Sequence, residues 1–394
     1  QHLGLLTLSD ATITTLGTGK YQGEDWAQDS NIVAEAGASS ITLGNSLALN
    51  VPRTITVADG ASLAITGRIV NGQLTKDGGG RLALAGTNGI NGALTISNGT
   101  VALEGVGAVS NVSSIVLGPT ATLDLAASAG FTLAASQQLI GSGTVTGVAV
   151  VAAGARIHPG AAGVAGTLTF GGDLTLPGAT NLIVDLPFTN APTDPHDRVP
   201  VAGTLTLNGD AIQVAGTTVN APGIYTVLTY GAKSGSFAPT AVKVARQLIT
   251  VDESVANEIR LIVAAGSDPA DLRWDGLTSN VWDTTLTTNW FNNGTLAPDA
   301  FFANDLVTFD DTPGVATQVV IAAGGVVPGQ VSVATTNNEF TLAGPGGIGG
   351  AGGLRKTGPA GLILAATNSF TGELEVQEGW VRAGSASAFG QSTS

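Results

Sequence analysis

Short runs in which apolar residues alternate with small or polar ones recur along the whole chain, and Gly, Asn, Asp or Pro separates each run from the next. Alternation with a period of two is typical of β-strands. Sustained helical periodicity is nearly absent, and only residues 241–255 are ambiguous between helix and strand. The clearest runs are 41–43, 46–49, 54–57, 62–65, 82–84, 94–96, 101–103, 115–117 and 122–125. The pattern therefore predicts an all-β fold made of short strands.

One stretch of the chain occurs twice, because residues 74–103 align without a gap with residues 354–383. An antiparallel sandwich would also contain many short strands, but it would not predict a displaced copy of a whole unit. Repeated units of short strands instead predict a solenoid that buries a core by stacking, here a parallel β-helix. The predicted repeat core consists of the apolar positions of both copies: Leu74, Leu82, Leu84, Leu94, Ile96, Val101, Leu354, Leu362, Leu364, Leu374, Val376 and Val381.

The first copy has a motif formed by Leu74, Lys76, Gly78, Leu82, Leu84, Thr87, Asn88, Ile90, Gly92 and Leu94. The second copy has the aromatic Phe370 at the position of Ile90. This motif resembles the passenger-associated, or autotransporter-associated, β-strand repeat of bacterial surface proteins. Segments 141–147, 158–170, 196–209 and 272–294 are also similar to those proteins. The resemblance implies a parallel β-helix that is exported to the bacterial cell surface. The sequence has no Met, even at position 1, and no basic-then-apolar leader at 2–10, so we expect that a signal peptide has already been removed.

Changes in composition divide the chain into four sections. Residues 1–70 are predicted to form entry coils, and 71–157 the first repeat with its continuation. Residues 158–265 contain many prolines and are predicted to form less regular closing coils. A joint at 264–269 precedes the section 271–394, which is predicted to start a second solenoid that is open at its C-terminal side.

Charge and composition exclude several classes of function. The net charge is −14, and only 15 Lys and Arg are spread over 394 residues, which argues against binding to nucleic acid or to an anionic membrane surface. No continuous apolar run is long enough for a membrane helix, so this segment is not expected to insert into a membrane. The absence of Cys excludes a catalytic thiol and cysteine zinc sites.

Candidate chemistry is sparse, since the histidines are His2, His158 and His196 and no serine-hydrolase motif is present. Asp194, His196 and Asp197 could form a metal or acid–base site, but a Pro-rich turn is a common place for such residues. Asp173 and Asp185 could share a face, as the carboxylates of polysaccharide-cleaving enzymes do. We interpret all of them as turn residues, and we expect no catalytic, cofactor or metal site and no enzymatic activity.

Two further motifs have a structural and a functional interpretation. The glycine-rich segment 347–352 fits the letters of a dinucleotide motif, but strand-like sequence follows it where a helix is required. Trp274, Trp282 and Trp290 are spaced by eight residues and could form an interaction surface for sugars. The favoured alternative is that these indoles cover the apolar end of the second solenoid section.

The resulting functional prediction is a non-catalytic, exported surface protein that builds an extracellular stalk or filament by repeat stacking. Its expected partner is another copy of itself, stacked head to tail, or further chain of a longer repetitive protein. The alternative is a passenger adhesin that binds glycans or host or environmental surfaces, and a distant alternative is a polysaccharide-degrading β-helix.

Overall fold

A computed structural model describes residues 2–15, 26–109, 111–179, 182–187, 195–216, 220–243, 247–264, 269–284, 286–312 and 314–391. Asp194 and residues 265–268 of the predicted joint lie outside these described residues. The described residues form strands and turns, and no helix among them has the length and apolarity to span a membrane. The prediction of an all-β fold is confirmed.

The chain divides into two compact units, one containing most residues up to Val263 and the other most residues from Ala264 onward. Each unit has its own apolar core. In the sequence, small residues, Asp and Pro replace the alternating pattern at 264–269, next to the start of the second unit's longest segment. The two units are therefore separate solenoid sections.

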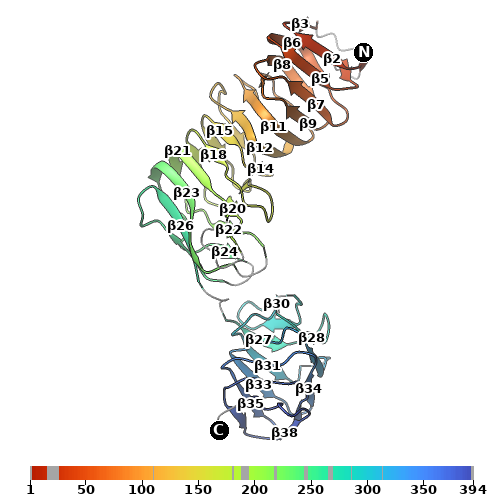
Figure 1. Ribbon diagram of the computed structural model, residues 1–394, viewed down its shortest axis with the longest axis vertical. Coiled ribbons are helices and arrows are strands. Elements are labelled where there is room, and N and C mark those ends of the chain that lie inside the picture. Colours follow the sequence, from red (N-terminus) through yellow and green to blue (C-terminus); the bar gives the residue numbers. More distant parts are fainter. Residues whose placement is uncertain are drawn as a thin grey trace. The chain divides into compact units, whose positions relative to one another are not determined.

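The first unit is a stack of parallel coils (Figure 1). One ladder contains β2 (Leu6–Ser9), β5 (Ile32–Ala36), β7 (Arg53–Val57), β9 (Leu74–Asp77), β11 (Gly92–Leu103), β12 (Val112–Asp124), β14 (Gln138–Gly141), β17 (Arg156–Pro159), β20 (Leu182–Val184), β22 (Ile212–Val214) and β24 (Val242–Lys243). A second ladder contains β3 (Thr12–Thr14), β6 (Ala38–Ala48), β8 (Ser62–Val70), β10 (Arg81–Leu84), β11, β12, β15 (Thr144–Thr146), β18 (Thr169–Phe170), β21 (Val199–Thr206) and β23 (Gly223–Ser234). Shorter pairings join β1 (His2–Leu3) through β4 (Trp26–Gln28) to β6, and β13 (Thr132–Leu133) through β16 (Ala149–Val151) and β19 (Leu174–Thr175) to β21.

The last part of the first unit departs from parallel pairing. Strand β26 (Glu258–Val263) runs antiparallel to β23 and to β25 (Ile249–Asp252). In this small antiparallel layer, β26 pairs with the backbone amides and carbonyls of β23 to which a further parallel strand would otherwise bind. It therefore closes one edge of the stack.

The second unit repeats the parallel arrangement with two ladders. One contains β27 (Asp271–Trp274), β31 (Leu306–Asp310), β33 (Gln330–Ala334), β35 (Gly353–Thr357) and β37 (Leu374–Val376), and the other contains β28 (Val281–Trp282), β32 (Gln318–Ile321), β34 (Phe340–Ala343), β36 (Gly361–Leu364) and β38 (Trp380–Ala383). At the start of the unit β29 (Trp290–Asn292) pairs antiparallel with β27 and with β30 (Ala297–Asp299). Both units therefore show the predicted parallel β-helix.

The predicted repeat-core side chains are buried, with three exceptions on the last coil. Leu374 and Val381 are half-buried, and Val376 is 46% exposed. Their strands, β37 and β38, pair with β35 and β36 on one side, and no described strand covers the other side. Val376 pairs in register with the buried Lys356, and a solenoid position of this kind is buried only when coils lie on both sides.

Candidate functional site

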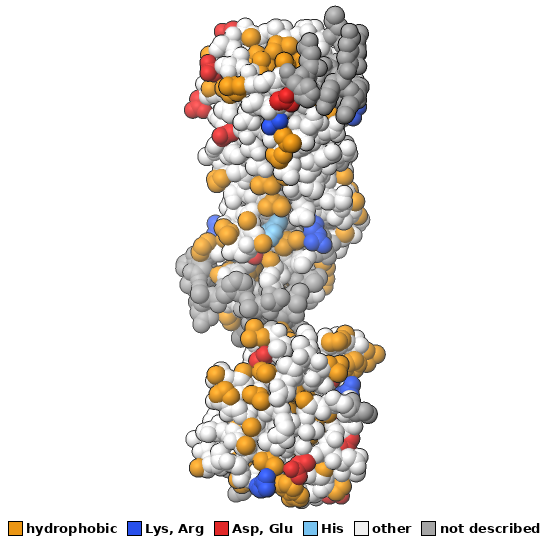
Figure 2. All heavy atoms as spheres, turned by 90° about the vertical axis from the view of Figure 1, so that its right-hand side faces the viewer, with side chains coloured by type: hydrophobic (Ala, Val, Ile, Leu, Met, Phe, Trp, Pro, Cys, Tyr) orange, Lys and Arg blue, Asp and Glu red, His pale blue; other side chains and the backbone are white. Residues whose placement is uncertain are grey.

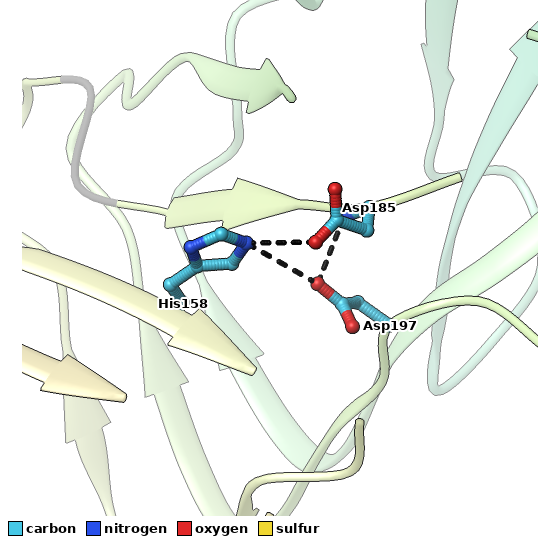
Figure 3. Close-up of side chains that lie close together, drawn as sticks. All are labelled: His158, Asp185 and Asp197. Carbon is cyan, nitrogen blue, oxygen red and sulfur yellow. Dashed lines mark hydrogen bonds and ion pairs between the residues drawn. The ribbon is translucent and has the colours of Figure 1, made fainter. Parts of the chain in front are cut away.

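Three side chains that are far apart in the sequence meet beside the first solenoid (Figure 3). His158 lies on β17, Asp185 directly follows β20, and Asp197 lies shortly before β21. Parallel pairing of β17 with β20 brings the first two residues onto neighbouring coils. His158 Nε2 is 3.0 Å from Asp185 Oδ2 and 3.8 Å from Asp197 Oδ2.

Backbone groups hold both carboxylates in place. Asp185 Oδ2 accepts a hydrogen bond from the Gly163 amide at 3.0 Å, and Asp197 Oδ1 accepts one from the Gly166 amide at 2.7 Å. The Asp185 amide donates to Asp197 Oδ2 at 2.8 Å, and the Asp197 amide donates back to the Asp185 carbonyl at 3.0 Å. The cluster therefore fastens the turn after β17 to the segment between β20 and β21.

Burial controls the electrostatics of this cluster. The side chains of His158 and Asp185 are only 13% and 11% exposed, and that of Asp197 is fully buried. Removal from water raises the pKa of the Asp197 carboxyl to about 7, although the Asp185 and Gly166 amides favour its charged form. In the described part of the chain, the ion pairs of these two carboxylates involve His158 and no Lys or Arg.

The cluster offers one imidazole nitrogen and two carboxylate oxygens, all within 4.8 Å of one another. These atom types bind divalent metal ions, and the same arrangement can also share a proton between the carboxylates and the imidazole. It is thus the group in the described residues with the clearest capacity for ligand chemistry.

The structure corrects the site considered from the sequence. Asp197 belongs to the cluster, but the His196 Nε2 atom lies 3.0 Å from the Thr226 carbonyl oxygen, and its ring packs edge-on against Tyr225. Asp197 is also no ordinary turn residue, because it is fully buried. His158 and Asp185 are brought to it by the register of the coils, and coil lengths are not visible in the local sequence.

The two carboxylates considered for catalysis, Asp173 and Asp185, have separate roles. Asp173 is exposed, and its Oδ1 atom accepts a hydrogen bond from the Thr204 amide at 2.7 Å. Asp185 is held instead by His158 and Gly163. The alternative in which Asp173 and Asp185 act together on one face therefore has no support in these contacts.

The three regularly spaced tryptophans do not form an interaction surface. Trp274, Trp282 and Trp290 lie on three different strands and are at most 1% exposed. Their rings surround Phe309 at the start of the second core, with Trp282 and Trp290 edge to face and Trp274 tilted against it. The interaction-surface hypothesis is wrong, because these large apolar rings are needed to cover the end of the core.

The glycine-rich segment 347–352 also has its expected structural form. It joins β34 to β35, and Ile348 forms a parallel bridge with Val326 of the preceding coil. A strand follows it where a dinucleotide site would require the N-terminus of a helix.

Residues 74–103 and 354–383 each match the family model described as Passenger-associated-transport-repeat. The chain carries two autotransporter passenger repeats. In both, two short strands of one coil flank a glycine turn, β9 and β10 in the first and β35 and β36 in the second, and each strand pairs in parallel with strands of neighbouring coils. The chain is also similar to the protein described as Adhesin BmaC autotransporter of Brucella suis biovar 1 (strain 1330), with 28% identity over 375 residues.

That alignment covers 82% of this chain and 10% of the relative, so the chain spans about a tenth of the length of the protein it matches. The repeats, the similarity and the parallel solenoid together identify an autotransporter passenger segment, which implies secretion to the cell surface. The relative's name describes adhesion by that whole protein.

Proposed function

We propose that this chain is part of a passenger adhesin and contributes to attachment of the bacterial cell to glycans or to other host or environmental surfaces. The observation that supports this function most is the similarity to an adhesin across both solenoid sections rather than within one repeat. An extended β-solenoid suits the role because its lateral faces offer a large surface built on a rigid scaffold. The face in Figure 2 has scattered charged side chains and scattered apolar side chains, and its few Lys and Arg side chains are spread out.

We further propose that the segment acts by binding and not by catalysis. A catalytic base must reach a substrate proton, whereas His158 and Asp185 are largely covered and Asp197 is fully buried. Both carboxylates are already held by backbone amides. These contacts support a role in organising the solenoid.

Adhesion is tested with beads that carry the purified chain through a C-terminal tag. We expect them to attach to cultured epithelial cells or to immobilised glycans more than beads carrying an unrelated acidic β-solenoid of similar size. Glycosidase treatment of the target surface separates binding to glycans from binding to protein. Equal attachment of both bead types to every surface would refute an adhesive role for this segment.

A stacking function has a separate observation in its favour. On the described residues, β37 and β38 are each paired on one side, and the side chains of Val376 and Trp380 are 46% and 42% exposed. We propose that this edge pairs with a further coil, supplied by more chain or by a second copy, because unpaired strand edges are templates for β-pairing. If a second copy supplies the coil, mass photometry should show oligomers that disappear in the Val376→Lys variant. A monomer at all concentrations contradicts stacking between copies.

A further inference from the structure

The cluster of His158, Asp185 and Asp197 brings one possible ligand atom from each side chain within 4.8 Å of the others. Ligand atoms about 2.1 Å from a tetrahedral ion are roughly 3.4 Å from one another. The His158 Nε2 atom is 3.0 Å from the Asp185 oxygen and 3.8 Å from the Asp197 oxygen, so the two separations lie on either side of that value. Figure 3 shows all three side chains pointing toward one common space.

The charges in this space are not balanced by any described Lys or Arg. Both carboxylates lie in a place that water scarcely reaches, where a charged carboxylate is costly without a compensating cation. A divalent ion supplies that compensation and lets the imidazole act as a neutral ligand.

The surrounding backbone holds the ligand atoms in orientation. Amides of Gly163 and Gly166 donate to the carboxylates of Asp185 and Asp197, and the Asp185 amide also donates to Asp197. Hydrogen bonds of this kind orient metal ligands in proteins and limit the reorganisation that binding requires. The small exposed fractions of His158 and Asp185 leave a route from solvent.

We propose that His158, Asp185 and Asp197 bind one divalent transition-metal ion of the Mn²⁺ or Zn²⁺ class. One imidazole nitrogen with two carboxylate oxygens suits these ions, whereas Mg²⁺ and Ca²⁺ favour sites made of oxygen ligands. The ion links β17 to the segment between β20 and β21, and it thereby stabilises the Pro-rich coils of the first solenoid.

The test uses the full chain, freed of metal with a chelator and then titrated with MnCl₂ or ZnCl₂ in a calorimeter. We expect about one equivalent to bind, and we expect Asp185→Asn and His158→Gln each to weaken binding by about tenfold or more. The matched controls are Asp173→Asn and His196→Gln, which change the same residue types outside the cluster. Binding to the controls should equal binding to the unchanged protein.

A spectroscopic measurement keeps the test decisive if a cluster variant fails to fold. Electron spin-echo spectra of the Mn²⁺-loaded His196→Gln protein should show coupling of the metal to an imidazole nitrogen. The proposal is overturned if that coupling is absent, if neither ion binds at up to about 1 mM, or if folded His158→Gln and Asp185→Asn proteins bind as the unchanged chain does.

Discussion

Lys76 and Lys356 are buried in the same way, each donating a hydrogen bond from its ammonium to the carbonyl of the glycine two residues later, Gly78 or Gly358, at 2.6 Å. Both glycines have a φ of +76°, a conformation that turns the chain and directs its carbonyls inward. Lys76 also donates to the Asn98 carbonyl of the next coil. The repeat lysine therefore satisfies backbone oxygens that the turn buries.

The first prediction compares neighbouring residues of β35. Lys356→Met should lower the free energy of unfolding of the second unit by about 2–4 kcal/mol, because the Thr357 and Gly358 carbonyls lose their charged donor. Arg355→Met should change it by about 0.5 kcal/mol or less, since the Arg355 side chain is 46% exposed. Urea unfolding followed by tryptophan fluorescence measures both, and equal effects would contradict the role assigned to the buried lysine.

The second prediction concerns pH. Removal from water lowers the pKa of Lys76 to about 8, below the value of 10.5 for an ordinary lysine, while nearby Asp77 and Asp59 oppose this. Between these two pH values the unfolded chain binds more protons than the folded one, so this group makes stability rise with increasing pH. Lys76→Met should remove that rise. The measurement is the free energy of unfolding of the unchanged protein and of Lys76→Met from pH 8 to 10.5. If it changes with pH by the same amount in both proteins, the pKa of Lys76 is not depressed.

The third prediction separates a buried tryptophan from an exposed one. Trp290→Ala should destabilise the second unit by about 3–5 kcal/mol, because it empties the end of the aromatic core around Phe309. Trp380→Ala should cost about 1 kcal/mol or less, since that ring is 42% exposed on β38. Thermal unfolding followed by circular dichroism gives the comparison. A small effect at Trp290 together with loss of glycan binding would restore the interaction-surface hypothesis.

The fourth prediction concerns Asp197 in protein kept free of metal. Asp197→Ala should cost about 1–3 kcal/mol, because the buried Asp185 amide and the half-buried Gly166 amide both lose an acceptor. Asp173→Ala is the control, because water can replace the exposed Asp173 carboxylate at the Thr204 amide. Hydrogen exchange should accelerate at Gly166 in the first variant only. Unchanged protection there would mean that the cluster does not fasten this turn.

Local pattern was sufficient to predict the strands and their parallel stacking. Alternation at Leu82 and Leu84, with its copy at Leu362 and Leu364, sets which side chains face inward, because successive residues of a strand point to opposite faces. The same reasoning predicted that the tryptophans cover a core end. It could not find Lys76 among the buried residues, because its partners are carbonyls whose direction depends on the turn and on the next coil.

The amino-acid sequence by itself determined the all-β class, the two repeats and most of the repeat core, since these follow from periodicity within and between short segments. Only the tertiary structure decided that His158 and Asp185 meet Asp197 and that His196 turns away to Thr226. The physical reason is register: pairing of Ile157 with Leu182 determines which residues of neighbouring coils become adjacent. The number of residues in a coil sets that pairing. In the irregular Pro-rich coils, no local sequence pattern reveals this number.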